Sequence, residues 1–276
     1  MRGLIRGIMD NLINALKNTV GDKRLLPFSV YSSIKEQRLL NVPVIKPMLI
    51  AVLLGNKALG KKGEISCTTG NFIFLSNNPA IDMRNIPKEN EYLALLIEFE
   101  PQDFDALEIS LVNQENYCVG EITPTLEKCL QQFVEWSYWA PQALWSLRRK
   151  EIIQLMCYLG YKEILSMVAN PNVGHRLHSL FTENMSNELT MASICQELAM
   201  SESTLRRKLK FEGTQLQEIK DQVKLGLGLH LLQSTMQSIG SIAEQCGYYS
   251  QSRFTSRFKT RFGLTPSELR KTKLAE

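Results

Sequence analysis

The sequence predicts an α+β protein with a β-rich N-terminal domain and an all-α C-terminal domain that holds two helix–turn–helix units joined by a long helix. Three observations lead to this prediction. Short β-prone runs occupy residues 28–100, helical periodicity dominates after residue 123, and one helix–turn–helix pattern occurs twice between residues 190 and 263.

Length and charge distribution indicate two domains with different partners. A chain of 276 residues exceeds the usual domain size of about 100–150 residues, so we expect an N-terminal domain over residues 1–169 and a C-terminal domain over residues 170–276. Residues 170–276 contain 14 Lys or Arg against 10 Asp or Glu, whereas 18 of each cancel in residues 1–169. The formal charge of +4 therefore lies in the C-terminal domain and indicates a polyanionic partner there.

The N-terminal segment and the cysteines indicate a cytoplasmic protein. Residues 1–20 have the apolar spacing of an amphipathic helix, and packing on its own domain is favoured over a membrane-surface anchor. No apolar run approaches the roughly 20 residues that span a bilayer. The six cysteines are scattered without a CxxC pair, which is typical of reduced thiols.

Residues 28–168 divide into a β-rich part and a helical part. The β-prone runs are FSVYSSI, PMLIAVLLG, EISCTTGNFIFLS and EYLALLIEF. LGNKALGKKG is expected to form a strand, a turn and a strand, and SNNPAIDM a loop. Helices are expected over residues 123–139 and 143–168. They carry Trp136, Trp139 and Trp145, for which core packing is favoured over a pocket or an interface.

The C-terminal domain contains an internal repeat, SICQELAMSESTLRRKLKFEG and SIAEQCGYYSQSRFTSRFKTRFG. The two segments align in their helix caps, apolar positions and basic positions, at an offset that grows from 48 to 50 residues. Each predicts a helix, a turn and a second capped helix, with first helices that begin at Thr190 and Ser238. We call residues 190–213 the first unit and residues 238–263 the second unit.

The second helix of each unit has one apolar face and one polar, basic face. Phe254, Phe258 and Phe262 recur every fourth residue and form one stripe, while arginines and a lysine lie between them. In a helix–turn–helix unit the second helix enters the major groove of DNA. Arginine pairs bidentately with guanine, and Lys or Arg at the groove edge neutralises phosphates.

A helix expected over about residues 215–233 connects the two units. It would hold them at a fixed separation, and adjacent major-groove segments on one DNA face lie about 34 Å apart. One subunit is therefore expected to read two adjacent major-groove segments of double-stranded DNA. After the second unit, TPSELRK predicts a further helix that begins with a capping box at Thr265.

Enzymatic activity, a cofactor and a metal site are not expected. The histidines, His175, His178 and His230, all lie in the C-terminal half, so the β-rich domain lacks the ligands of a metal-dependent barrel enzyme. His175 and His178 stand three apart on a helix, but a surface pair is favoured over a metal site. The alternatives that stay open are a nonspecific architectural DNA binder, a helical protein-interaction module and a barrel enzyme fused to a DNA tether.

The repeat and the run SIAEQCGYYSQSRFTSRFKTRFGLTPSELRK resemble the AraC/XylS family of bacterial transcription regulators over residues 173–273. The resemblance implies a regulator of transcription, most often an activator, with a repressor as the alternative. It places DNA contacts at Ser203, Arg206 and Arg207 in the first unit and at Gln251, Ser252 and Thr255 in the second. With the groove-facing positions of the pattern, the expected DNA-binding residues are Ser203, Thr204, Arg206, Arg207, Lys210, Gln251, Ser252, Arg253, Thr255, Ser256 and Lys259.

The chain also departs from the family pattern. Ser256 stands where arginine is common, and in the connecting helix Lys224 replaces the usual arginine and Gly228 the usual alanine. Gly226 and Gly228 each cost about 1 kcal/mol against alanine in a helix. This helix is therefore either less stiff than usual or packed closely against a neighbour.

The β-rich region resembles the N-terminal domain of one branch of the same family, a small cupin-like β-barrel followed by helices. The similarity rests on PMLIAVLLGNKALGKKGEISCTTGNFIFLS and EYLALLIEFE. It implies that the barrel senses a small-molecule effector and that the helices mediate homodimerisation. RNA polymerase is a further partner implied for a regulator of this kind.

Overall fold

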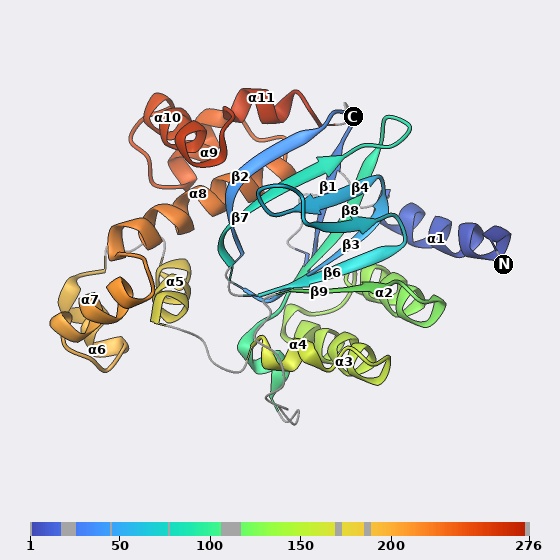
Figure 1. Cartoon of the computed structure of the whole chain (residues 1–276), viewed down its shortest axis with the longest axis horizontal. Helices are drawn as coiled ribbons and strands as arrows, with labels where there is room; N and C mark the ends of the chain where they lie inside the picture. The colour runs from blue at the N-terminus through green and yellow to red at the C-terminus, as the bar shows by residue number, and fades with distance from the viewer. Residues whose placement is uncertain are drawn as a thin grey trace.

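The computed structural model describes residues 2–17, 26–44, 46–76, 78–105, 117–168, 173–184 and 189–273. A β-barrel with helices on one side is followed by a series of C-terminal helices, so the structure has the expected α+β class (Figure 1). The strands of the barrel are β1 (Ser29–Ser33), β2 (Gln37–Val44), β3 (Met48–Leu54), β4 (Asn56–Leu59), β5 (Ile65–Thr68), β6 (Asn71–Leu75), β7 (Asn78–Ile86), β8 (Tyr92–Glu98) and β9 (Tyr117–Glu121).

Two antiparallel sheets make up the barrel. A five-stranded sheet has the order β1-β8-β3-β6-β9, and a four-stranded sheet has the order β2-β7-β4-β5. The central strands of the larger sheet, β8, β3 and β6, are buried on both faces. Along β3, Leu49, Ala51 and Leu53 pack against the N-terminal helices, whereas Ile50 and Val52 point into the barrel. Burial on both faces explains why the runs that predict these strands are apolar without alternation.

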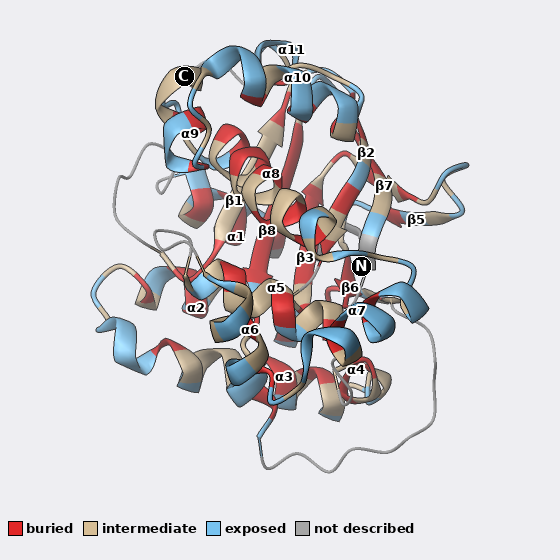
Figure 2. Ribbon diagram, turned by 90° about the vertical axis from the view of Figure 1, so that its left-hand side faces the viewer, coloured by how far each residue is buried: buried red, intermediate tan, exposed pale blue. Residues whose placement is uncertain are grey.

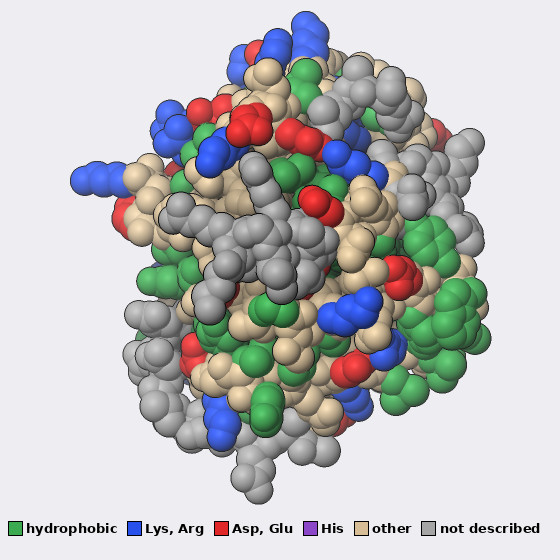
Figure 3. All heavy atoms as spheres, turned by 90° about the vertical axis from the view of Figure 1, so that its right-hand side faces the viewer, with side chains coloured by type: hydrophobic (Ala, Val, Ile, Leu, Met, Phe, Trp, Pro, Cys, Tyr) green, Lys and Arg blue, Asp and Glu red, His purple; other side chains and the backbone are tan. Residues whose placement is uncertain are grey.

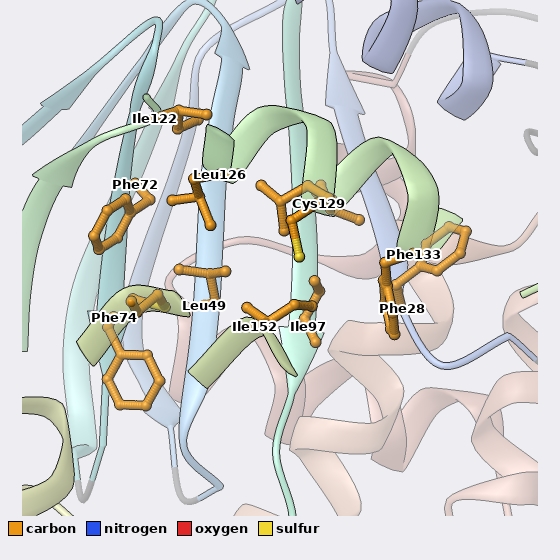
Figure 4. Close-up of a cluster of buried hydrophobic side chains, with 14 of the residues drawn as sticks. Phe28, Leu49, Phe72, Phe74, Ile97, Ile122, Leu126, Cys129, Phe133 and Ile152 are labelled. Atoms are coloured by element: carbon orange, nitrogen blue, oxygen red, sulfur yellow. The ribbon is translucent and has the colours of Figure 1, made fainter. Parts of the chain in front are cut away.

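The N-terminal helices cover the outer face of the larger sheet. Figure 4 shows Leu126, Cys129 and Phe133 facing side chains of the sheet, with Ile152 in the same cluster. Leu16 is fully buried in this cluster as well, so the expected packing of the first helix on its own domain is confirmed. The layer consists of α1 (Arg2–Lys17), α2 (Pro124–Trp136), α3 (Trp145–Tyr158), α4 (Glu163–Ser166) and the 3-10 helices η1 (Pro101–Phe104) and η2 (Gln142–Leu144).

Three predictions about the N-terminal half were wrong in detail. The segment SNNPAIDM is not a loop, because most of it forms β7, which pairs with β2 and β4. Its polar residues suit strands of the smaller sheet, which is less covered than the larger one. The helix expected over residues 143–168 is broken at Gly160, whose φ of 105° ends α3 before α4 begins. Core packing holds for Trp145, but Trp139 is 72% exposed.

The C-terminal helices include both expected units. The boundary expected between residues 169 and 170 lies outside the described residues. No helix in the described ranges is long and apolar enough to cross a bilayer. The helices are α5 (Val173–Glu183), α6 (Met191–Glu197), α7 (Glu202–Phe211), α8 (Leu216–Ser234), α9 (Ile239–Gln245), α10 (Gln251–Phe262) and α11 (Pro266–Arg270).

The two units are packed in different ways. Buried side chains of the first unit form a cluster with α5 and the start of α8. Those of the second unit, α11 and the end of α8 join the barrel interior in one continuous cluster. The second unit is therefore docked on the barrel, and the first unit has a core of its own.

The glycines of α8 mark close packing. A Cβ on Gly228 would lie 2.7 Å from the ring of Phe254 and 3.3 Å from the sulfur of Cys246. A Cβ on Gly226 would lie 3.4 Å from Pro43 of β2. The connecting helix is thus packed against two neighbours, and Gly228 is the position at which a larger residue does not fit.

Gly228→Ala is therefore expected to destabilise the protein although alanine favours helix. The gain of about 1 kcal/mol in helix propensity is outweighed by about 1–3 kcal/mol of overpacking against a fully buried phenylalanine. Gly226→Ala is the matched control, because it has the same propensity gain without a clash of that severity. Urea unfolding measures both, and a Gly228→Ala variant as stable as Gly226→Ala would contradict the packing.

Candidate DNA-binding surface

The repeat in the sequence corresponds to a repeat of caps in the structure. The hydroxyl of Ser201 accepts a hydrogen bond from the amide of Thr204 at the start of α7, and Ser250 accepts one from Arg253 at the start of α10, both at 3.3 Å. The preceding helices are capped in the same way, by Thr190 for α6 and by Ser238 for α9. All of these caps are predicted by the sequence, because each depends on residues three apart.

The turn between the helices of each unit needs a left-handed residue. Ala199 has φ 52° in the first unit, and the equivalent Gly247 has φ 71° in the second. A non-glycine residue in this conformation costs about 1–2 kcal/mol. The turn of the first unit is consequently the more strained of the two.

The expected DNA-binding residues lie on the outer surface of both units. Figure 2 shows α7 and α10 on the same side of the molecule, with exposed residues along both helices. The side chains that face the core, such as Leu205 and Phe258, are buried. Of the expected residues, Thr204 and Thr255 are half-buried, and the exposed ones are Ser203, Arg206, Arg207, Lys210, Gln251, Ser252, Arg253, Ser256 and Lys259.

The basic side chains of α7 and α10 differ in how they are held. Arg206 forms an ion pair with Glu202 at 2.6 Å, and Arg257 forms one with Asp221 of α8. Within the described part of the chain, no ion pair holds the exposed side chain of Arg207 or of Lys259. These two cations are accordingly available to an external anion.

Arg261 serves the contact with the barrel instead of the outer face. Its Nε donates to the carbonyl of Asn41 at 3.0 Å, and the amide side chain of Asn41 donates to the carbonyl of Arg261 at 3.3 Å. Only 12% of the Arg261 side chain is exposed. The four cations in the stretch that contains the phenylalanine stripe therefore do not share one role.

A buried polar network connects the barrel to the end of the C-terminal half. Gln37, which is 2% exposed, accepts hydrogen bonds from Asn85 at 2.8 Å and from Gln233 of α8 at 3.0 Å, and donates to Thr272 at 2.8 Å. Lys57 donates to Asn85 at 2.7 Å, and burial lowers the pKa of this lysine to about 8. Sequence reasoning missed the network, since no local pattern relates residues almost 200 positions apart.

Glu212 is a second residue that the sequence did not indicate. Its carboxylate accepts hydrogen bonds from the amides of Val173 and Gly174, both at 2.8 Å. It thereby satisfies the first turn of α5 and ties that helix to the end of α7. An acidic residue at a helix N-terminus is a known signal, but here the acid comes from a different helix.

The histidines are not a surface pair. His175 and His178 are both half-buried, and burial, with lesser contributions from His175 and Lys46, lowers the pKa of His178 to about 3. In the described ranges, no group of three or more His, Cys, Asp or Glu side chains is placed to hold a metal ion. The prediction of a surface pair was therefore wrong: both histidines are half-buried, and burial favours their neutral form.

A cavity of about 1020 Å³, which we call the crevice, lies between the two halves of the chain. Its N-terminal wall comes from β1, β3, β8, η1, η2 and α3, and its C-terminal wall from Glu183 of α5 and His230 of α8. Tyr31 and His230 both line it, and the hydroxyl of Tyr31 lies within hydrogen-bonding distance of Nδ1 of His230, at 3.3 Å. Burial lowers the pKa of His230, while nearby Glu98 opposes that effect.

Comparisons with known proteins support the identity of the C-terminal units. Residues 194–272 match a family described as a helix–turn–helix domain. The HTH-type transcriptional regulator GadX of Escherichia coli O6:H1 is 35% identical over 105 residues, which cover 38% of this chain and 38% of that protein. The urease operon transcriptional activator of Escherichia coli is 30% identical over 91 residues, 33% of this chain and 31% of that protein. The chain thus spans less than half of the length of these relatives.

Solved structures share the fold over most of the chain. ToxT from Vibrio cholerae aligns with a TM-score of 0.67 at 16% identity and covers 91% of this chain and 100% of that one. A structure of ToxT with a bound unsaturated fatty acid aligns with a TM-score of 0.65 at 16% identity, over 90% of this chain and 96% of that one. The fold is thus that of an N-terminal barrel followed by a helical C-terminal domain.

The separate packing of the two units predicts different effects of core truncation. Leu209→Ala should cost about 2–5 kcal/mol and loosen only the first unit, whereas Phe258→Ala should cost about 3–5 kcal/mol and loosen the barrel as well. All three tryptophans belong to the N-terminal half, so tryptophan fluorescence reports that half and far-UV circular dichroism reports all helices. A fluorescence transition that shifts equally in both variants would contradict the separate core.

Proposed function

We propose that this chain, whose residues 194–272 form an AraC/XylS-type helix–turn–helix domain, is a sequence-specific DNA-binding regulator of transcription and acts as an activator. The observation that carries the proposal is the pair of units whose second helices, α7 and α10, each bury an apolar face and carry polar and basic residues among the exposed ones (Figure 2 shows the exposed residues of both helices). A helical protein-interaction module would not need basic side chains at equivalent positions in both units.

The dimensions of α8 suit two contacts with one DNA duplex. A helix of 19 residues is roughly 28 Å long, and successive major-groove segments on one face lie about 34 Å apart. Phosphate neutralisation by residues such as Lys210 and Lys259 would supply much of the affinity. Base edges would be read by side chains such as Arg207, Gln251 and Arg253.

We also propose a small-molecule effector and a homodimer for the N-terminal half, in a cytoplasmic protein that contacts RNA polymerase. The crevice supports the first, because it is large enough for a small molecule and lies between the halves. Exposed apolar side chains support the second: Trp139 is 72% and Leu147 62% exposed, and hydrophobic side chains gather in one area of the face that carries α1 (Figure 3).

Competition with unrelated DNA tests the proposed function. A specific regulator should prefer its own site by roughly 10³-fold or more, whereas a nonspecific architectural protein should show no such preference. Its site is found by selecting bound sequences from a random duplex library with the full chain. The absence of an enriched sequence would contradict the proposal. Enrichment of a site that lies beside a promoter would support a role in transcription regulation.

Arg207→Ala is expected to weaken binding to the selected site by about 1–3 kcal/mol and to relax specificity at one position, because a base contact is lost. A mobility-shift titration against the selected site and a scrambled site measures both effects. Ser267→Ala, on the exposed face of α11, is the control. Unchanged affinity for the selected site would remove Arg207 from the interface.

Lys259→Ala is expected to weaken binding to all DNA sequences alike. The loss of one phosphate contact should reduce the slope of log affinity against log salt concentration by about one. Lys88→Ala removes the same charge from an exposed turn of the barrel and should leave the slope unchanged. Equal slopes for wild type and Lys259→Ala would contradict the phosphate contact.

A further inference from the structure

We infer that the crevice binds a small organic cation, with an amine or guanidinium group near Glu98 and an apolar body against the aromatic wall. The inference rests on the proposed function only for its regulatory consequence, because binding itself is measured without DNA. It concerns the chemistry of the occupant, which differs from the fatty acid carried by a ToxT structure of the same fold.

The balance of charges in the crevice favours a cation. Its two basic side chains are already paired. Nζ of Lys46 lies 2.7 Å from Oε1 of Glu100, and Nε of Arg149 lies 2.5 Å from Oδ2 of the fully buried Asp103. The remaining acidic side chains have no cationic partner within the described part of the chain, and they are Glu98, Asp105 and Glu183. A carboxylate ligand would enter this field against repulsion, and a cation would be attracted.

Glu98 is the crevice acid that influences the contact between the halves. It acts electrostatically on both Tyr31 and His230, which line the crevice and lie within hydrogen-bonding distance of each other, at 3.3 Å. Its side chain is exposed and is not used in an ion pair of the described structure. An ammonium group beside Glu98 would therefore contact an N-terminal strand and the connecting helix α8 at once.

The aromatic wall suits the remainder of such a ligand. Phe28, Tyr31 and Trp145 line the crevice together with Met48 and Leu96. Aromatic faces attract cations and pack against apolar bodies. These side chains would therefore pack against the apolar body of the ligand.

A ligand bound in the crevice would contact both halves of the chain. Glu183 and His230 belong to α5 and α8, and all other residues that line the crevice belong to the N-terminal half. Since α8 joins the two units, a ligand held between α8 and the barrel would restrict how the units move relative to each other. The ligand would thereby change the affinity of the full chain for DNA.

The test uses matched ligands and the full-length protein. Three bodies (butyl, 3-phenylpropyl and dodecyl) are each compared as the amine, the neutral alcohol and the carboxylic acid by calorimetry and thermal shift at pH 7.5. We expect at least one amine to bind ~5-fold or more tightly than its alcohol, and its acid to bind more weakly still. An acid that binds as well as its amine, or no binding by any amine, would overturn the inference.

Two variants locate the site. Glu98→Gln should remove the preference for the amine over the alcohol, and Glu183→Gln should reduce it to a smaller extent. Glu244→Gln, an exposed acid of α9 outside the crevice, is the matched control. Amine binding that survives Glu98→Gln unchanged would place the ligand elsewhere and overturn the inference. DNA affinity is titrated separately without ligand, so failure of the proposed function is recognised independently.

Discussion

The structure depends on one shared apolar core, in which the stripe of Phe254, Phe258 and Phe262 joins the interior of the barrel through α8 and β2. Every ring of the stripe is fully buried. Because hydrophobic burial is not directional, the polar contacts around this core fix how the second unit sits on it. The reciprocal bonds between Arg261 and Asn41 and the network around Gln37 are these contacts.

The shared core explains why a single short helix carries both aromatic rings and cations. The rings attach α10 to the protein, and Arg261, which lies next to Phe262, extends that attachment to the backbone of β2. Arg257 and Lys259 are both exposed, but Arg257 forms an ion pair with Asp221 of α8. Cations that look equivalent in the sequence thus divide into one that holds the unit in place and others that remain on the outer surface.

The sequence predicts what depends on residues close together in the chain. The caps at Ser201 and Ser250, the buried positions and the long connecting helix all follow from patterns within about ten residues. The strand β7 was missed because its polar, Asn-rich start resembles a loop and its partner β2 lies about 40 residues away. Gln37 and Glu98 carry no local signal either, since their roles arise only when the barrel meets α8.

The different packing of the two units gives the crevice its place in the protein. The second unit is fixed to the barrel, while the first packs with α5 and the start of α8 in a core of its own, and α5 and α8 supply the C-terminal wall of the crevice. A force applied at His230 acts on α8, which belongs to both cores, because Ile219 and Val223 pack with the first unit and Leu229 and Leu232 with the second. A ligand in the crevice beside Tyr31 and His230 would therefore act on α8, which packs with both units, without touching the proposed DNA-binding residues of either unit.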